Sequence, residues 1–319
     1  MISIIYSTNR KNPKFEWFRD SLLLQMTDED IKNVEIIMVD YCFDPQENWN
    51  NPLEPFKGII TKPKQNIYQG PGRLTKTEMF SPSNARNTGA MLSSGDYLVF
   101  IDDVGLCMPG WWNAVKQSAE YNMIVCGAYQ KHWEMVVEGG KLISSRSEQN
   151  GIDSRWNQGN NFGPVGIQGS QLFGCSFGIP YKDFISVNGF DEICDSIGGE
   201  DYQFGLRLNN AGKQIFYDRR MLTIESEELH DQDYKMLRED RVISPEQYML
   251  KLLKYGVHRR YIQGNWDSSH MILDILHGMK QTWTIGNNYT ISDQRNKKQL
   301  PEKDFVDVHW FDDKPLSEI

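Results

Sequence analysis

The chain has 319 residues, of which 39% are hydrophobic and 24% are charged, and its formal net charge at pH 7 is −9. These values are ordinary for a globular protein and exclude disordered and fibrous classes. The acidic balance, without a block of consecutive Lys or Arg, argues against a large nucleic-acid footprint, because duplex binding needs a basic face.

Neither the N-terminus nor the cysteines indicate secretion. Residues 1–7 (MISIIYS) look like a strand, and no apolar run reaches the roughly 18 residues of a membrane span. Five cysteines without a CxxC pair are typical of free buried thiols in a reducing compartment. We therefore expect a soluble, cytoplasmic protein.

The first part of the chain predicts a strand–helix–strand unit. Apolar runs at residues 2–6 and 34–39 flank a helical pattern over residues 15–25. Parallel strands in such a unit end at one edge of the sheet, where ligands bind. Thr8 and Asp40 follow the two strands, so both are expected at that edge, although an acid after a strand is also a common turn residue.

A second helix and strand follow a third short strand, which we expect at residues 59–61. The pattern predicts a helix over residues 84–93, which carries Arg86, and a buried strand over residues 97–101. This strand runs into Asp102 and Asp103. Arg86 is then either a binding residue or a plain surface charge on the helix.

The middle of the chain predicts a helix over residues 112–121, a strand over 123–129 and a hairpin over 133–142 around Gly139-Gly140. Residues 144–171 are rich in Gly, Asn and Ser. We expect them to form either a lid over a bound ligand or a floppy insertion.

Residues 173–201 end in the turn Gly198-Gly199, after which Glu200 and Asp201 fall in the first turn of a helix that Gly212 closes. Carboxylates there face the positive end of the helix dipole, so Asp201 is expected to stay ionised and able to act as a base. Acids in a first turn also serve simply as caps. Residues 214–217 then predict a short edge strand.

Several of these motifs, in this order, resemble glycosyltransferases of the GT-A fold. The stretch SFGIPYKDFISVNGFDE with the following GGED is similar to the C-terminal half of the galactosyltransferase catalytic domain. The opening strand, its Thr-containing loop and the ARNTG helix before a strand that ends in acids resemble family-2 glycosyltransferases. The resemblance covers residues 2–230.

The resemblance implies an α/β fold with a mostly parallel central sheet flanked by helices. With it we expect a GT-A catalytic domain in residues 1–240. Helical patterns over residues 244–255 and 269–279, beyond the resemblance, predict a helical C-terminal extension in residues 241–319. The implied reaction is inverting transfer of a sugar from a nucleoside-diphosphate sugar to an acceptor hydroxyl, such as that of a glycan. Asp201 would be the general base and Glu200 would contact the acceptor.

The resemblance also implies a donor site and a metal site. The donor would meet residues at the strand ends and on the preceding helix: Thr8, Asp40, Asn84, Arg86, Asp102 and Asp103. A divalent ion, Mn²⁺ or Mg²⁺, would bind Asp103, Glu227 and His230, which stands 29 residues after Asp201.

Three positions depart from the family pattern. Val104 stands where the second Asp of an Asp-x-Asp motif is usual, Ile197 where a Trp is usual, and Glu227 where a Met is usual. Since a carboxylate suits Mn²⁺ or Mg²⁺ better than a thioether, Glu227 is expected to compensate for Val104.

Two other functions stay open. One is transfer to a modified base in DNA, as in viral DNA-glucosylating enzymes. The other is a non-catalytic protein that binds a sugar or a nucleotide on a GT-A scaffold.

Overall fold

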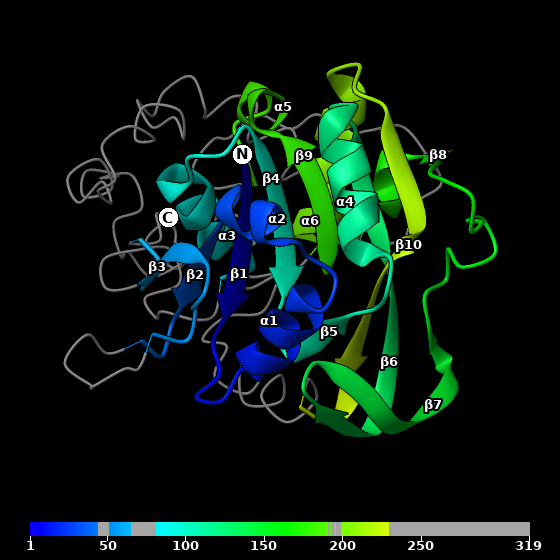
Figure 1. Cartoon of the computed structure of the whole chain (residues 1–319). Coiled ribbons are helices and arrows are strands. Elements are labelled where there is room, and N and C mark those ends of the chain that lie inside the picture. Colours follow the sequence, from blue (N-terminus) through cyan, green and yellow to red (C-terminus); the bar gives the residue numbers. More distant parts are fainter. Residues whose placement is uncertain (44–50, 65–80, 191, 193–194, 196–198, 230–319) are drawn as a thin grey trace, which may run out of the picture.

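The computed structural model describes residues 1–43, 51–64, 81–190, 192, 195 and 199–229 (Figure 1). The strands are β1 (Ile2–Thr8), β2 (Val34–Asp40), β3 (Lys57–Thr61), β4 (Tyr97–Asp102), β5 (Gly105–Cys107), β6 (Ile124–Glu138), β7 (Lys141–Ile152), β8 (Val165–Ile167), β9 (Ser176–Pro180) and β10 (Ile215–Ser226). The helices are α1 (Phe15–Leu23), α2 (Asp28–Lys32), α3 (Pro82–Leu92), α4 (Trp111–Glu120), α5 (Tyr181–Ser186) and α6 (Glu200–Asn210), with a 3₁₀ turn, η1 (Gly169–Gln171).

The strands form one sheet in the order β3-β2-β1-β4-β9-β6-β10-β5, with β7 paired to β6 and β8 paired to β10. Strands β3, β2, β1 and β4 are parallel to one another, and β6 is parallel to β10. Strand β9 is antiparallel to both of its neighbours, β4 and β6. The predicted α/β fold with a mostly parallel central sheet is therefore confirmed.

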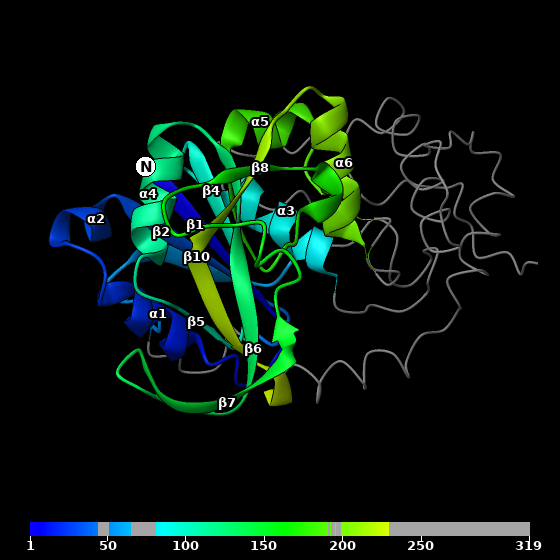
Figure 2. The ribbon, with the colours of Figure 1, turned by 90° about the vertical axis from the view of Figure 1, so that its right-hand side faces the viewer.

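Helices cover both faces of the sheet, with α1 and α4 on one side and α3 and α6 on the other (Figure 2). Strands β1, β2 and β4 are near-continuous apolar runs because both of their faces are buried. Two apolar clusters fill the two interfaces between sheet and helices. No described helix has the length and apolar character needed to cross a bilayer.

A group of phenylalanines joins α6 to the middle of the sheet. Phe100 of β4 stacks on Phe177 of β9, with ring centroids 4.7 Å apart. Phe190 stacks on Phe204 of α6 at 4.4 Å, and Phe190 and Phe204 both contact Phe177. Since such stacked and edge-on pairs add to the burial of apolar surface, this group fixes where the first turn of α6 lies relative to β4.

The second half of the sheet corrects two expectations. Strand β6 continues to Glu138, well past residue 129, and forms a ribbon with β7 around the predicted turn Gly139-Gly140, where both residues have positive φ. Half-buried and exposed residues alternate in the ribbon part of β6, and the hairpin predicted over 133–142 lies within this ribbon. The predicted short edge strand at 214–217 is instead the start of the long β10, which lies between β6 and the strands β5 and β8.

The segment expected to be an irregular lid contains the end of β7, all of β8 and η1. Between them, Arg155 is buried with its guanidinium 4.2 Å from the ring centre of Phe173 and 4.6 Å from that of Tyr217. The same guanidinium pairs with Asp153 at 2.7 Å and donates to the carbonyl of Gly127 at 2.9 Å. This part of the chain is therefore anchored to the sheet, which contradicts the floppy insertion, whereas a lid over a bound ligand stays a prediction.

Several expectations lie outside the described residues, namely those for Ile197, Cys194, His230 and the C-terminal extension, residues 241–319. The four described cysteines are free thiols; Cys107 and Cys126 are buried as expected, Cys175 is partly buried, and Cys42 is exposed.

The phenylalanine group gives a test of the core. Phe177 is 0% exposed, so Phe177→Ala should lower the free energy of unfolding by about 3–5 kcal/mol, through lost burial and the cavity left behind. Phe162, which is 95% exposed, is the matched control, and Phe162→Ala should change it by less than about 0.5 kcal/mol. Urea unfolding of both variants measures the difference; similar losses in the two would contradict this core.

Candidate active site

Three of the predicted donor residues lie at one edge of the sheet, where β1 and β4 end toward the bottom of Figure 1. Thr8 pairs with Asp40 in the register of β1 and β2, and Ser7 pairs with Asp102 in the register of β1 and β4. The Asp40 carboxylate accepts a hydrogen bond from the backbone N–H of Cys42 at 2.7 Å, and burial raises its pKa. Thr8 and Asp40 thus share the expected edge.

Asp103 turns back toward the loop after β1. Its carboxylate accepts a hydrogen bond from the Thr8 hydroxyl at 2.5 Å and pairs with Arg10 Nε at 3.0 Å. Burial raises the pKa of Asp103 to about 6, against the opposing effect of Arg10 and Thr8. Arg10, which sequence analysis did not single out, also donates to the carbonyl of Leu229 and so joins this loop to the end of the described chain.

Val104 stands at the position where the family pattern has its second Asp. Its φ is +52°, a left-handed conformation that a β-branched residue rarely adopts, and its side chain is buried. Its N–H donates to the carbonyl of Pro13 and its carbonyl accepts from the N–H of Ser226. Val104 is therefore a packed bend between β4 and β5, and it presents no group to a ligand.

Asp102 is the open member of the pair, with its side chain 38% exposed. It accepts a hydrogen bond from Arg86 Nη2 at 2.9 Å. Arg86 Nη1 donates to Glu200 Oε1 at 2.9 Å, and Nη2 is also 3.4 Å from the carbonyl oxygen of Gly174. The structure thus brings together the end of β4, helix α3 and the first turn of α6.

Asp201 lies beside Glu200 at the start of α6, after Gly199 in a left-handed conformation. Its carboxylate accepts the N–H of Gly174 at 3.2 Å and its neighbour's N–H, that of Tyr202, at 2.7 Å. Burial raises the pKa of Asp201, the negative charge of Glu200 raises it further, and the two N–H groups and Arg86 oppose the rise. The sequence suggested that the helix terminus keeps Asp201 ionised. In the structure, burial outweighs the helix terminus and raises the pKa of Asp201 toward the range that suits a general base.

The end of β10 brings further acids to the site. Glu227 pairs with Lys131 at 3.0 Å. Glu225 is 6% exposed, and its Oε1 has no hydrogen-bond partner within the described part of the chain. Burial, then the charge of Asp102, raises the pKa of Glu225 to about 8. Sequence analysis missed Glu225 because it did not extend the strand beyond residue 217.

Two of the three predicted metal ligands, Asp103 and Glu227, lie in the described part of the chain. Across the described ranges, no three Asp, Glu, His or Cys side chains are grouped as a bound ion requires. Asp103 is engaged by Arg10 and Thr8, and Glu227 by Lys131. The third predicted ligand, His230, lies outside the described residues.

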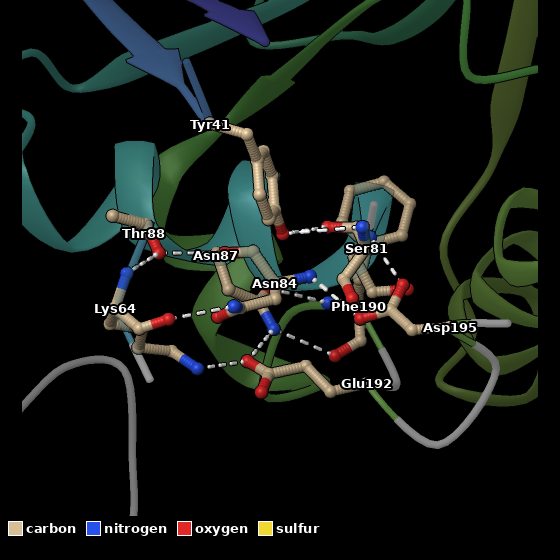
Figure 3. A network of polar contacts seen from close by, with 10 residues as sticks. Tyr41, Lys64, Ser81, Asn84, Asn87, Thr88, Phe190, Glu192 and Asp195 are labelled. Carbon is tan, nitrogen blue, oxygen red and sulfur yellow. Dashed lines mark hydrogen bonds and ion pairs between the residues drawn. The ribbon is translucent and has the colours of Figure 1, made fainter. Parts of the chain in front are cut away.

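Asn84 belongs to a buried polar network around the start of α3 (Figure 3). Its amide donates to the backbone carbonyl of Lys64 at 2.8 Å. Asp195 accepts the backbone N–H of Ser83 at 2.8 Å and that of Asn84 at 3.1 Å, so its carboxylate occupies the positive end of this helix. The Asn84 side chain is thus used inside the protein, two residues before Arg86.

The same network holds the chain just before the turn that carries the candidate base. Lys64 Nζ lies 2.6 Å from Glu192 Oε1, and Asn87 donates to Glu192 at 2.9 Å (Figure 3). The side-chain amide of Asn87 also donates to the Phe190 carbonyl at 3.0 Å and accepts the Phe190 N–H at 2.9 Å. Phe190, Glu192 and Asp195, which precede α6 in the chain, are therefore docked on α3.

Comparisons with known proteins support a glycosyltransferase. Residues 163–230 match the family described as the N-terminal domain of galactosyltransferase, a stretch that includes Glu200 and Asp201. The crystal structure of S. aureus TarS 1-349 in complex with UDP matches with a TM-score of 0.50 and 12% identity, over 85% of this chain and 69% of that chain. This likeness shows a shared GT-A-like fold. No curated protein sequence matches the chain.

Glu225 gives a pH-dependent test of the site in the absence of divalent ions. Its pKa is raised in the folded protein, so the ionised carboxylate should cost stability as pH rises from about 4.5 toward 8. Glu225→Gln removes that charge and should therefore gain stability relative to the wild type over this range, by up to roughly 4 kcal/mol. Urea unfolding of both proteins at several pH values measures the gap; a gap that stays constant with pH would contradict this environment for Glu225.

Proposed function

We propose that the protein is an inverting glycosyltransferase that moves a sugar from a nucleoside-diphosphate sugar to an acceptor hydroxyl. The observation that carries the proposal is the position of Asp201. Its carboxylate has a raised pKa, lies at the first turn of α6 and shares a charge network with Glu200, Arg86 and Asp102. Asp102 is the exposed carboxylate at the strand edge where ligands of this fold class bind.

In this mechanism Asp201 accepts the proton of the acceptor hydroxyl. The hydroxyl oxygen forms a bond to the anomeric carbon as the bond from that carbon to the diphosphate breaks on the opposite face. The bonding electrons leave with the nucleoside diphosphate, so a single displacement inverts the anomeric centre. Glu200, one residue before the base, would contact the acceptor sugar.

The donor would lie across the strand ends. Thr8 and Asp40 would meet its base and ribose, and Asp102 its sugar or ribose hydroxyls. Because the TarS structure holds UDP, we propose a uridine diphosphate sugar as the first donor to test. Mn²⁺ or Mg²⁺ remains a proposal from the family resemblance, and we derive no step through it because Asp103 and Glu227 are engaged by cationic side chains.

A thermal-shift screen tests donor binding. UDP-, GDP-, dTDP- and CMP-linked sugars, each with and without Mn²⁺, should include one that raises the melting temperature, since a ligand that binds the folded state stabilises it by mass action. We expect the UDP sugar to do so. Binding without hydrolysis or transfer would favour a non-catalytic scaffold, and no shift with any donor would contradict the proposal.

Asp201→Asn tests the base. The amide cannot accept the acceptor proton, so kcat should fall by roughly 10³-fold, while donor binding should change by less than about threefold. Asp28→Asn, an exposed acid in the first turn of α2, is the matched control and should leave both quantities unchanged. An active Asp201→Asn enzyme would sink this assignment.

A further inference from the structure

We propose that Arg86 is a positioning residue, which holds Asp102 on the donor side and Glu200 on the acceptor side in one arrangement, and does not itself bind the donor phosphates. This inference rests on the proposed function. It replaces the role in phosphate or base binding that the family resemblance implies for Arg86.

The first argument is the set of segments that meet at one guanidinium. Arg86 lies on α3 and pairs with Asp102, 16 residues away at the end of β4, and with Glu200, 114 residues away at the start of α6. Both contacts are 2.9 Å, and they use the two terminal nitrogens separately. The planar guanidinium can make both contacts at a fixed spacing, so it sets the distance between the two carboxylates.

The second argument is enclosure. Arg86 is 4% exposed. Its guanidinium carbon lies 5.3 Å from the ring centre of Phe190. On another side, a Cβ added to Gly174 would come within 2.8 Å of Nη2, which shows how closely the backbone there approaches. The guanidinium cannot swing to a diphosphate without leaving both carboxylates, and the Glu200 carboxylate, whose side chain is 13% exposed, would then lack its cation in a largely buried place.

The third argument is charge. Arg86 faces the carboxylates of Asp102, Glu200 and Asp201. Burial and the Glu200 charge raise the pKa of Asp201, whereas Arg86 lowers it. One cation therefore reduces the repulsion between neighbouring acids and keeps the base in the ionised form that accepts a proton. Its contribution to the reaction is made through Glu200 and Asp201, without contact to the reacting atoms.

The proposal is tested with two variants, Arg86→Lys and Arg86→Gln, each compared with the wild type. Arg86→Lys keeps the charge but cannot bridge two carboxylates from one plane, and Arg86→Gln removes the charge. In both, kcat should fall about 100-fold or more because the base and its neighbour lose their geometry, while the dissociation constant for the donor nucleotide, UDP, should change by less than about threefold. Arg146→Gln is the matched control, since Arg146 forms an exposed pair with Glu134, and it should leave kcat and UDP binding unchanged.

The pH profile of kcat distinguishes positioning from loss of packing alone. The charged groups that face Asp201 are Glu200 beside it and Arg86 from α3. Without the Arg86 charge, the acidic limb of the profile should move to higher pH in Arg86→Gln. A loss of UDP affinity of about 30-fold with kcat unchanged would show instead that Arg86 binds the phosphates, and would overturn the proposal.

Gly174→Ala is a second variant that keeps every charged group. Its methyl group should displace the guanidinium, so kcat should fall while UDP binding is kept; an unaltered kcat would count against the proposal. Hydrogen exchange at the first turn of α6, residues 199–203, needs no activity. Exchange there should be faster in both Arg86 variants than in Arg146→Gln, and equal exchange overturns the proposal even if the wild type transfers no sugar. A wild type without transfer but with faster exchange in the variants would refute only the proposed function.

Discussion

The relative positions of Asp102 and Glu200 at the candidate site depend on how the protein stabilises one buried guanidinium, that of Arg86. A charge taken out of water must be matched by opposite charges nearby, and Arg86 finds them in Asp102 and Glu200. Because these carboxylates come from β4 and α6, satisfying the cation requires that α3, β4 and α6 meet correctly. The electrostatic requirement of folding and the spacing of the site are therefore the same constraint.

Packing supports that constraint from behind. Phe190 and Phe204 stack on each other and against the β4–β9 core, which fixes α6 in the direction of the sheet. Glu192 and Asp195 bind the start of α3 from the other direction. The apolar contacts, which have no preferred direction, set how closely α6 packs on the sheet. The directional hydrogen bond between Glu200 and Arg86 sets how α6 is rotated about its axis.

The part of the fold made of local signals could be predicted from the sequence. Strands β1, β2 and β4 are apolar runs, and the edge shared by Thr8 and Asp40 follows from parallel pairing. The lengths of β10 and of the β6–β7 ribbon were underestimated. These strands mix polar and apolar residues, and β10 pairs with strands that are distant in the chain. For the same reason the partners of Arg86 and the burial of Glu225 could not be foreseen, whereas the residue types at the base and at the strand ends could.

The carboxylate of Asp195 at the start of α3 carries a further consequence. Such helix ends commonly cradle phosphate groups, but here the carboxyl group of Asp195 already accepts the N–H groups of Ser83 and Asn84. Asp195 thus acts as an intramolecular competitor that closes this cradle to any phosphate. Inorganic phosphate or sulfate would have to displace the Asp195 side chain to bind at this helix end.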